Sequence, residues 1–363
     1  MTIAWHARAA AAAVLTAATL AGCTNAAAPT GLDPVAASAP ANAQALEQAY
    51  VSVVAKVLPS VVQITTTRDL GSGIVIDDKG DIVTNAHVVG QATKFQVRLA
   101  NSSAPVPATL VGAYPPDDLA VIHLDQLPSP APKPAHFGNS AALRIGDIVL
   151  AMGNPLGLTG SVTDGIVSAT GRTVSEPTEV GSPGATLPDV IQTSASINPG
   201  NSGGALVDLS GDVVGVPTLA AIAPQLGGGL GGLGGGSAAP GIGFAIPSNV
   251  VTDIAGQLIA HNGHVLDSHR AALGVRVATV VDLNGQPVGA GVESVTAEGP
   301  AAGAGVQAGD VITAIGTTPV HTTGDLTTAL AQLRPGQRVP MTIMGTAGAS
   351  RTTMVTLGQL PGA

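Results

Sequence analysis

The residues best suited to chemistry form a turn of small amino acids around one serine. Residues 200–204 read Gly-Asn-Ser-Gly-Gly, so the hydroxyl of Ser202 can be exposed while several backbone N–H groups point at one position. Acyl transfer needs such a loop, because preorganised donors stabilise the negative charge that develops on the substrate's carbonyl oxygen. We predict that Ser202 is a nucleophile. We also predict that Gly200, Asn201 and Ser202 form the oxyanion loop, with the N–H groups of Gly200 and Ser202 as donors.

A serine hydroxyl reacts only when a base takes its proton, and the sequence offers a base at the end of an apolar run. His87 follows the run 81–84 and is the predicted base. The imidazolium needs a carboxylate to fix its tautomer, and Asp117 and Asp118 both precede an apolar strand; we prefer Asp118. Taken singly, Ser202 and His87 could belong to an ordinary Gly-rich turn and a strand-end histidine. Together they favour a Ser-His-Asp triad.

Short apolar runs bounded by turn formers must position these side chains. Regular short strands of this kind predict a mostly β chain built as a barrel or sandwich. The predicted strands are 61–65, 73–77, 81–84, 95–99, 119–124, 147–152, 165–169, 190–193, 205–208, 213–216 and 243–246. A helix should begin with Ser248 as its N-cap and stop at Asn262 and Gly263. The Gly-rich segment 225–236 is predicted to be a mobile surface loop.

Three segments carry a family resemblance. T-N-A-H-V at 84–88, D-L-A-V at 118–121 and N-P-G-N-S-G-G at 198–204 resemble the HtrA-type proteases of the chymotrypsin fold. Further matching segments are 71–76, 153–155, 165–169 and 241–247. The resemblance covers about residues 50–359 and implies two six-stranded β-barrels, with the triad between them. It also implies that His87 and Asp118 come from the first barrel and Ser202 from the second.

The sequence departs from related patterns near the predicted nucleophile. Asn201 stands where many chymotrypsin-fold enzymes carry an Asp that pairs with a newly cut N-terminus, so that activation is not expected here. Ser194 and Ala205 replace the Asp and Pro of many relatives. We expect activity to depend instead on the ordering of the loops 153–160 and 176–189, as the resemblance implies.

The segment before the nucleophile bears on specificity. Residues 194–198 contain no acid that could bind a Lys or Arg side chain at the cut site. Ser196, Ile197, Gly243 and Ala245 are predicted to line the S1 pocket with an apolar wall. Small or branched aliphatic residues at the cut site are therefore expected.

A second pattern begins near residue 272. Leu273, Gly274 and Val275 resemble the carboxylate-binding loop of PDZ domains, in which backbone N–H groups hold a peptide's terminal carboxylate. The segments 299–306 and 309–312 also resemble the PDZ core, and a helix over 325–333 should follow. This implies an α+β PDZ domain that binds peptide C-termini between strand 275–281 and the helix. The alternative is a β-rich accessory domain whose Leu273 packs in a core.

The N-terminus predicts export. Arg8 precedes an apolar run that ends at Cys23 in a Leu-Ala-Gly-Cys sequence resembling the bacterial lipobox. We expect a signal peptide over 1–23, lipidation of Cys23 and a location at the cell envelope; the alternative is simple cleavage and release. A flexible linker over 24–45, a protease domain over 46–264 and a PDZ domain over 268–360 should follow.

Composition limits the partners. Charged residues make up 10% of the chain and the net charge is −9, so no electrostatic footprint for nucleic acid is present. No cofactor is expected, and no metal, because His261 and His264 have no third ligand nearby in the sequence. The expected function is a serine endopeptidase for unfolded or exposed envelope and secreted proteins. The alternative is an envelope chaperone or PDZ scaffold with little turnover. The resemblance implies a homotrimer, for which the segment 51–57 offers apolar surface.

Overall fold

A computed structural model describes residues 41–66, 70–100, 102, 104–154, 160–175, 185–198, 200–222 and 238–361. The predicted signal peptide, Cys23, the linker up to residue 40 and the Gly-rich segment 225–236 lie outside the described residues. The described residues from Leu46 onward belong to one compact unit. Within the described ranges, no helix has the length and apolar character needed to cross a bilayer.

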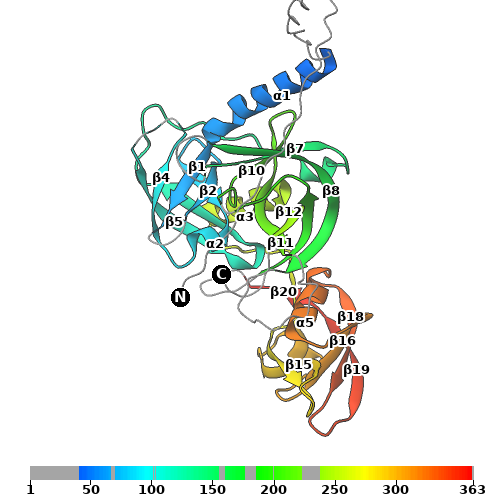
Figure 1. The fold of residues 1–363 in the computed structure, drawn as a ribbon. Coiled ribbons are helices and arrows are strands. Elements are labelled where there is room, and N and C mark those ends of the chain that lie inside the picture. The colour runs from blue at the N-terminus through cyan, green and yellow to red at the C-terminus, as the bar shows by residue number, and fades with distance from the viewer. Residues whose placement is uncertain are drawn as a thin grey trace, which may run out of the picture. The chain divides into compact units, whose positions relative to one another are not determined.

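The first barrel is a closed antiparallel sheet with the strand order β1-β2-β3-β6-β5-β4 (Figure 1). Its strands are β1 (Val61–Thr65), β2 (Leu70–Val75), β3 (Asp81–Thr84), β4 (Lys94–Arg98), β5 (Val106–Tyr114) and β6 (Leu119–Leu124). Five of the six were predicted, with small shifts at the ends of β2 and β4. The sixth, β5, was not predicted, because Pro107 and Gly112 interrupt its apolar pattern and its pairing with β6 shifts register between Leu110 and Gly112.

The second barrel is also closed, in the order β10-β11-β12-β9-β8-β7. It contains β7 (Ile148–Gly153), β8 (Ser161–Ser175), β9 (Thr186–Thr193), β10 (Ala205–Asp208), β11 (Val213–Ile222) and β12 (Ala238–Pro247). Strand β8 is longer than the predicted run 165–169, because register shifts against β9 carry it past Gly171, which has a φ of 71°. The two six-stranded barrels implied by the resemblance are confirmed.

Helix α3 (Ser248–Ala260) packs on β5, β6 and β11 and so contacts both barrels. Val251, Ile254 and Leu258 are buried on its inner face, as the apolar spacing predicts. The prediction of Ser248 as N-cap is wrong, since β12 runs directly into the helix and Pro247 takes that position. The Ser248 hydroxyl instead donates to the Gly138 carbonyl at 2.6 Å. The helix ends at Ala260 with His261 as its C-cap, and the predicted stop residues Asn262 and Gly263 follow with φ values of 52° and 89°.

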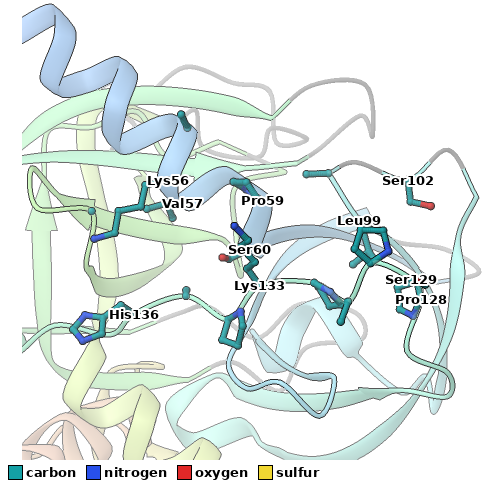
Figure 2. A pocket seen from close by; sticks show the side chains of 18 residues that line it. Lys56, Val57, Pro59, Ser60, Leu99, Ser102, Pro128, Ser129, Lys133 and His136 are labelled. Carbon is teal, nitrogen blue, oxygen red and sulfur yellow. The ribbon is translucent and has the colours of Figure 1, made fainter.

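Helix α1 (Ala41–Val57) begins inside the range 24–45 that was assigned to the linker. Val53 and Val57 are buried in the core, whereas Leu46 and Val51 are exposed. The Lys56 ammonium group donates to the Ser210 carbonyl oxygen at 2.7 Å. A cleft of about 590 Å³ lies beside this end of α1 and is lined by the proline-rich segment 128–134. Figure 2 shows Lys56, Val57 and Pro128 among the side chains that line it. None of the predicted site residues lines it.

The C-terminal domain is a sheet in the order β14-β15-β16-β18-β19, with β17 paired to β16. Its elements are β13 (Ala271–Ala272), β14 (Val275–Val281), β15 (Pro287–Val295), α4 (Pro300–Gly303), β16 (Val311–Ile315), β17 (Thr318–Pro319), α5 (Thr323–Ala331), β18 (Arg338–Met344), β19 (Ser350–Thr356) and β20 (Gly358–Gln359). Strand β14 matches its prediction. Helix α5 starts two residues earlier than predicted, at a capping box formed by Thr322 and Asp325. The predicted boundary at 264–268 falls between α3 and β13.

Candidate active site

The candidate base lies on the short helix α2 (Ala86–Val89), directly after β3. The His87 side chain is 28% exposed, and its Nδ1 lies 2.8 Å from Asp118 Oδ2. An ionised carboxylate only accepts hydrogen bonds, so in the neutral ring Nδ1 carries the hydrogen and Nε2 is the basic nitrogen. That tautomer is the one that can take a proton from a hydroxyl.

Asp118 is held by its backbone as well as by its carboxylate. It follows the 3-10 turn η2 (Pro115–Asp117) with a left-handed φ of 50°, a conformation that Asp tolerates better than most residues. Its carbonyl oxygen accepts from the Ala86 N–H at 3.1 Å. Its carboxylate accepts from the His87 backbone N–H at 2.9 Å, from His87 Nδ1 and from Thr218 Oγ1. Three donors therefore fix one acid that is 2% exposed.

The neighbouring acid has a different partner. Asp117 Oδ1 accepts from Arg270 Nη1 at 2.6 Å, and the same guanidinium donates to the carbonyl oxygens of Pro116 and Thr186. Burial raises the pKa of the Asp117 carboxyl, and the Arg270 charge opposes part of that rise. Of the two adjacent acids, the one preferred from the sequence is the one that pairs with the histidine.

The serine loop connects β9 and β10 of the second barrel. Gly200 and Gly203 have φ values of 113° and 78°, which only glycine adopts without strain. A Cβ on Gly203 would overlap the Ser72 carbonyl oxygen. The Asn201 N–H donates to the Asn198 carbonyl at 3.1 Å, so it is used within the loop. The N–H groups predicted as oxyanion donors are those of Gly200 and Ser202.

Thr218 on β11 contacts both the serine and the acid, and sequence reasoning missed it. Ser202 Oγ donates to the Thr218 carbonyl oxygen at 3.4 Å. The Thr218 hydroxyl donates to Asp118 Oδ2. The only sequence signal was a polar residue at the end of the apolar run 213–217.

The predicted S1 residues are partly buried in the second barrel. Ile197 and Ala245 are 5% and 0% exposed and belong to its core, whereas Ser196 is exposed. A Cβ on Gly243 would overlap Ile197 Cγ1, so these two residues lie against each other. The Ile197 side chain therefore fills the space beside β12.

The candidate peptide site of the C-terminal domain lies along β14, which is the end strand of its sheet. Gly274 has a φ of 70°, and Leu273 is 2% exposed in the domain core. The N–H of Thr323, at the start of α5, donates to Thr279 Oγ1 at 3.1 Å, so α5 flanks the strand. In the part of the chain that the structure describes, no cluster of three or more His, Cys, Asp or Glu could hold a metal ion.

Two family models match the chain: a trypsin-like peptidase domain over residues 71–216 and a PDZ domain over residues 271–353. Serine protease PepD of Mycobacterium tuberculosis is 39% identical over 341 residues, which cover 90% of this chain and 70% of that protein. The chain belongs to the HtrA family of trypsin-like serine proteases. It has one PDZ domain after the two barrels of the peptidase.

Other HtrA proteins match over less of their length. A probable periplasmic serine endoprotease, DegP-like, of Pseudomonas fulva is 38% identical, and the match covers 81% of this chain and 57% of that one. Among solved structures, an HtrA-type protease AlgW with a decapeptide has a TM-score of 0.54 and 31% identity, covering 86% of this chain and 99% of that chain. The serine endoprotease from Yersinia pestis has the same TM-score, 32% identity, and coverage of 86% and 98%.

Proposed function

We propose that this HtrA chain is an active endopeptidase with Ser202 as nucleophile, His87 as general base and Asp118 as the orienting acid. The observation that carries the proposal is the set of contacts around Asp118. Its carboxylate holds the His87 ring in the basic tautomer from the first barrel and bonds to Thr218 from the second. Thr218 in turn accepts from the Ser202 hydroxyl, so the three proposed groups share one connected hydrogen-bond network.

The proposed reaction is an acyl transfer through two tetrahedral intermediates. His87 Nε2 takes the Ser202 proton as Oγ bonds to the scissile carbonyl carbon, and the imidazolium is stabilised by Asp118. The intermediate collapses as the C–N bond breaks, and the leaving amine takes the proton from the imidazolium. Water, deprotonated by the same nitrogen, then bonds to the acyl carbon. The C–Oγ bond breaks, Oγ takes the proton back from the imidazolium, and the acid is released. The N–H groups of Gly200 and Ser202 are the proposed donors to the oxyanion.

The proposed substrates are unfolded or exposed segments of envelope and secreted proteins. The apolar contact of Ile197 with Gly243 supports a small or branched aliphatic side chain at the cut site. The PDZ domain is proposed to bind peptide C-termini along β14, with the loop at Leu273, Gly274 and Val275 holding the carboxylate. This use of an end strand fits its place in the sheet.

Export to the envelope, with a lipid anchor at Cys23, is proposed from the N-terminal sequence and from relatives named periplasmic. A homotrimer is proposed from the family resemblance. The exposed Leu46 and Val51 of α1 offer apolar surface for it.

Labelling with a fluorophosphonate followed by mass mapping tests the proposed function. The phosphorus should be found on Ser202, and Ser202→Ala should abolish both labelling and cleavage of an unfolded protein such as casein. His87→Ala should prevent labelling while leaving the fold intact. Lack of labelling with peptides added as activators, while the PDZ domain still binds them, would favour the chaperone or scaffold function instead.

A further inference from the structure

Ser72 lies in β2 of the first barrel, yet most of its hydrogen bonds reach the second. Its side chain and backbone are fully buried, at 0% exposure. The hydroxyl donates to the Gly200 carbonyl at 2.6 Å and accepts from the Asn154 N–H at 2.9 Å. Its backbone N–H donates to the Ser202 carbonyl at 3.0 Å. A residue outside the proposed triad thus touches the nucleophile loop at two points and the end of β7 at a third.

These contacts fix the Gly200–Asn201 and Ser202–Gly203 peptide planes, which lie on either side of the Asn201–Ser202 segment. A peptide unit is planar, so holding the Gly200 carbonyl oxygen also sets the plane of the next amide, and holding the Ser202 carbonyl oxygen sets that of Gly203. The Gly203 N–H is held in addition by the Pro217 carbonyl at 3.0 Å. The loop needs such support, because its glycines have broad conformational freedom of their own.

The other side of Ser72 is fixed by its own barrel. The Thr84 hydroxyl donates to the Ser72 carbonyl oxygen at 2.6 Å, and both residues are fully buried. Thr84 ends β3, directly before the segment that carries His87. A chain of hydrogen bonds therefore runs from the strand before the base, through Ser72, to the carbonyl oxygens on both sides of Asn201.

We propose that Ser72 is a positioning residue, whose hydroxyl and amide hold the Ser202 loop in the geometry needed for attack. This inference rests on the proposed function and adds a residue that touches neither substrate nor reacting atoms. The hydroxyl is needed because it donates and accepts at once, which an alanine cannot do. Its loss leaves the Gly200 carbonyl and the Asn154 N–H without this partner and frees the loop to rotate.

Ser72→Ala in the full chain tests the proposal. Misplacement of a reacting group by about 1 Å can cost about a hundredfold in rate, so we expect kcat on a peptide substrate to fall about ten- to a hundredfold. KM should stay within about twofold, because the S1 and PDZ residues are untouched. The midpoint of the kcat–pH profile should not move, because the His87–Asp118 pair is intact. Labelling by fluorophosphonate should reach the same stoichiometry as wild type, at a lower rate.

Ser248→Ala is the matched control. Ser248 is also fully buried, and its hydroxyl also donates to a backbone carbonyl at 2.6 Å, that of Gly138. We expect Ser248→Ala to lower the unfolding midpoint about as much as Ser72→Ala does, and to leave kcat unchanged. Ser72→Thr keeps a hydroxyl and should recover kcat toward wild type. If Ser72→Ala does not fold, Thr84→Val can be used instead, because it removes only the hydrogen bond from the Thr84 hydroxyl to the Ser72 carbonyl oxygen. It should lower kcat about two- to fivefold without changing KM.

Two results would overturn the proposal. One is that Ser72→Ala is labelled to a lower stoichiometry, while the molecules that do react are labelled at the wild-type rate. Ser72 would then only keep more of the molecules folded. The other is an equal loss of kcat in Ser248→Ala. Failure of the proposed function looks different, since wild-type protein would then not be labelled either.

Discussion

Thr218 gives the sharpest test of the hydrogen-bond network, because its hydroxyl is one of three donors on the Asp118 carboxylate. Thr218→Val keeps the branched shape and removes that donor. A hydrogen bond to an ionised group contributes about 1.5–3 kcal/mol, which corresponds to about 10–150-fold in rate if all of it were lost at the transition state. The same bond exists in the ground state, so only its orienting part affects the barrier. We expect kcat to fall about tenfold.

The assay compares kcat and KM on a peptide with an aliphatic cut site, alongside the rate of fluorophosphonate labelling of Ser202. Thr218→Ser retains the hydroxyl and should stay within about threefold of wild type. KM should change little in either variant, because Thr218 is 4% exposed and is not among the predicted S1 residues. The reasoning is refuted if Thr218→Val keeps wild-type kcat, or if Thr218→Ser loses as much as Thr218→Val.

Three further predictions follow from the contacts of single acids. Asp118→Asn should lower kcat by about 10⁴ with little change in KM, because an amide favours the wrong His87 tautomer; a loss under tenfold would contradict this. Arg270→Met should cost about 3–5 kcal/mol in urea unfolding, because Asp117 keeps a buried charge without its guanidinium, and adding Asp117→Asn should restore part of the loss. Hydrogen bonding from the His321 N–H lowers the pKa of Asp325 in the folded domain. The ionised Asp325 therefore stabilises the fold above the pKa of Asp325 in the unfolded chain, and this stabilisation is lost as pH falls through its folded-state pKa. Asp325→Asn should therefore flatten the loss of PDZ thermal stability below about pH 4, and an unchanged slope would argue against this cap.

The candidate site was predictable from the sequence where its residues sit in local patterns. A strand followed by His87, and small residues around Ser202, each indicate a role within a few positions. Thr218 could not be found in this way, because its contacts to Asp118 and Ser202 depend on how β11 passes the serine loop. Ser72 was part of a matching segment, but its proposed role depends on its contact with Gly200 of the second barrel, a residue 128 positions further along the chain.

The fold was predictable where apolar residues form uninterrupted runs. Strand β5 was missed because a proline, a glycine and a register shift disturb its alternation. The start of α1 was missed because its first turn, Ala-Asn-Ala-Gln, has little charge or apolar periodicity, although alanine favours helix. The helix start at Ser248 was placed correctly, but its capping was not, because the hydroxyl found a tertiary partner in Gly138.

The division of the candidate site between two barrels affects when the enzyme can cut. The first barrel alone carries an oriented imidazole with no hydroxyl to deprotonate, and the second alone carries a serine without a base. A chain that is still folding, or one whose barrels have briefly separated, is therefore inactive even if each barrel is well formed. With the proposed triad, a newly made molecule therefore cuts no other chain until both barrels have closed on each other.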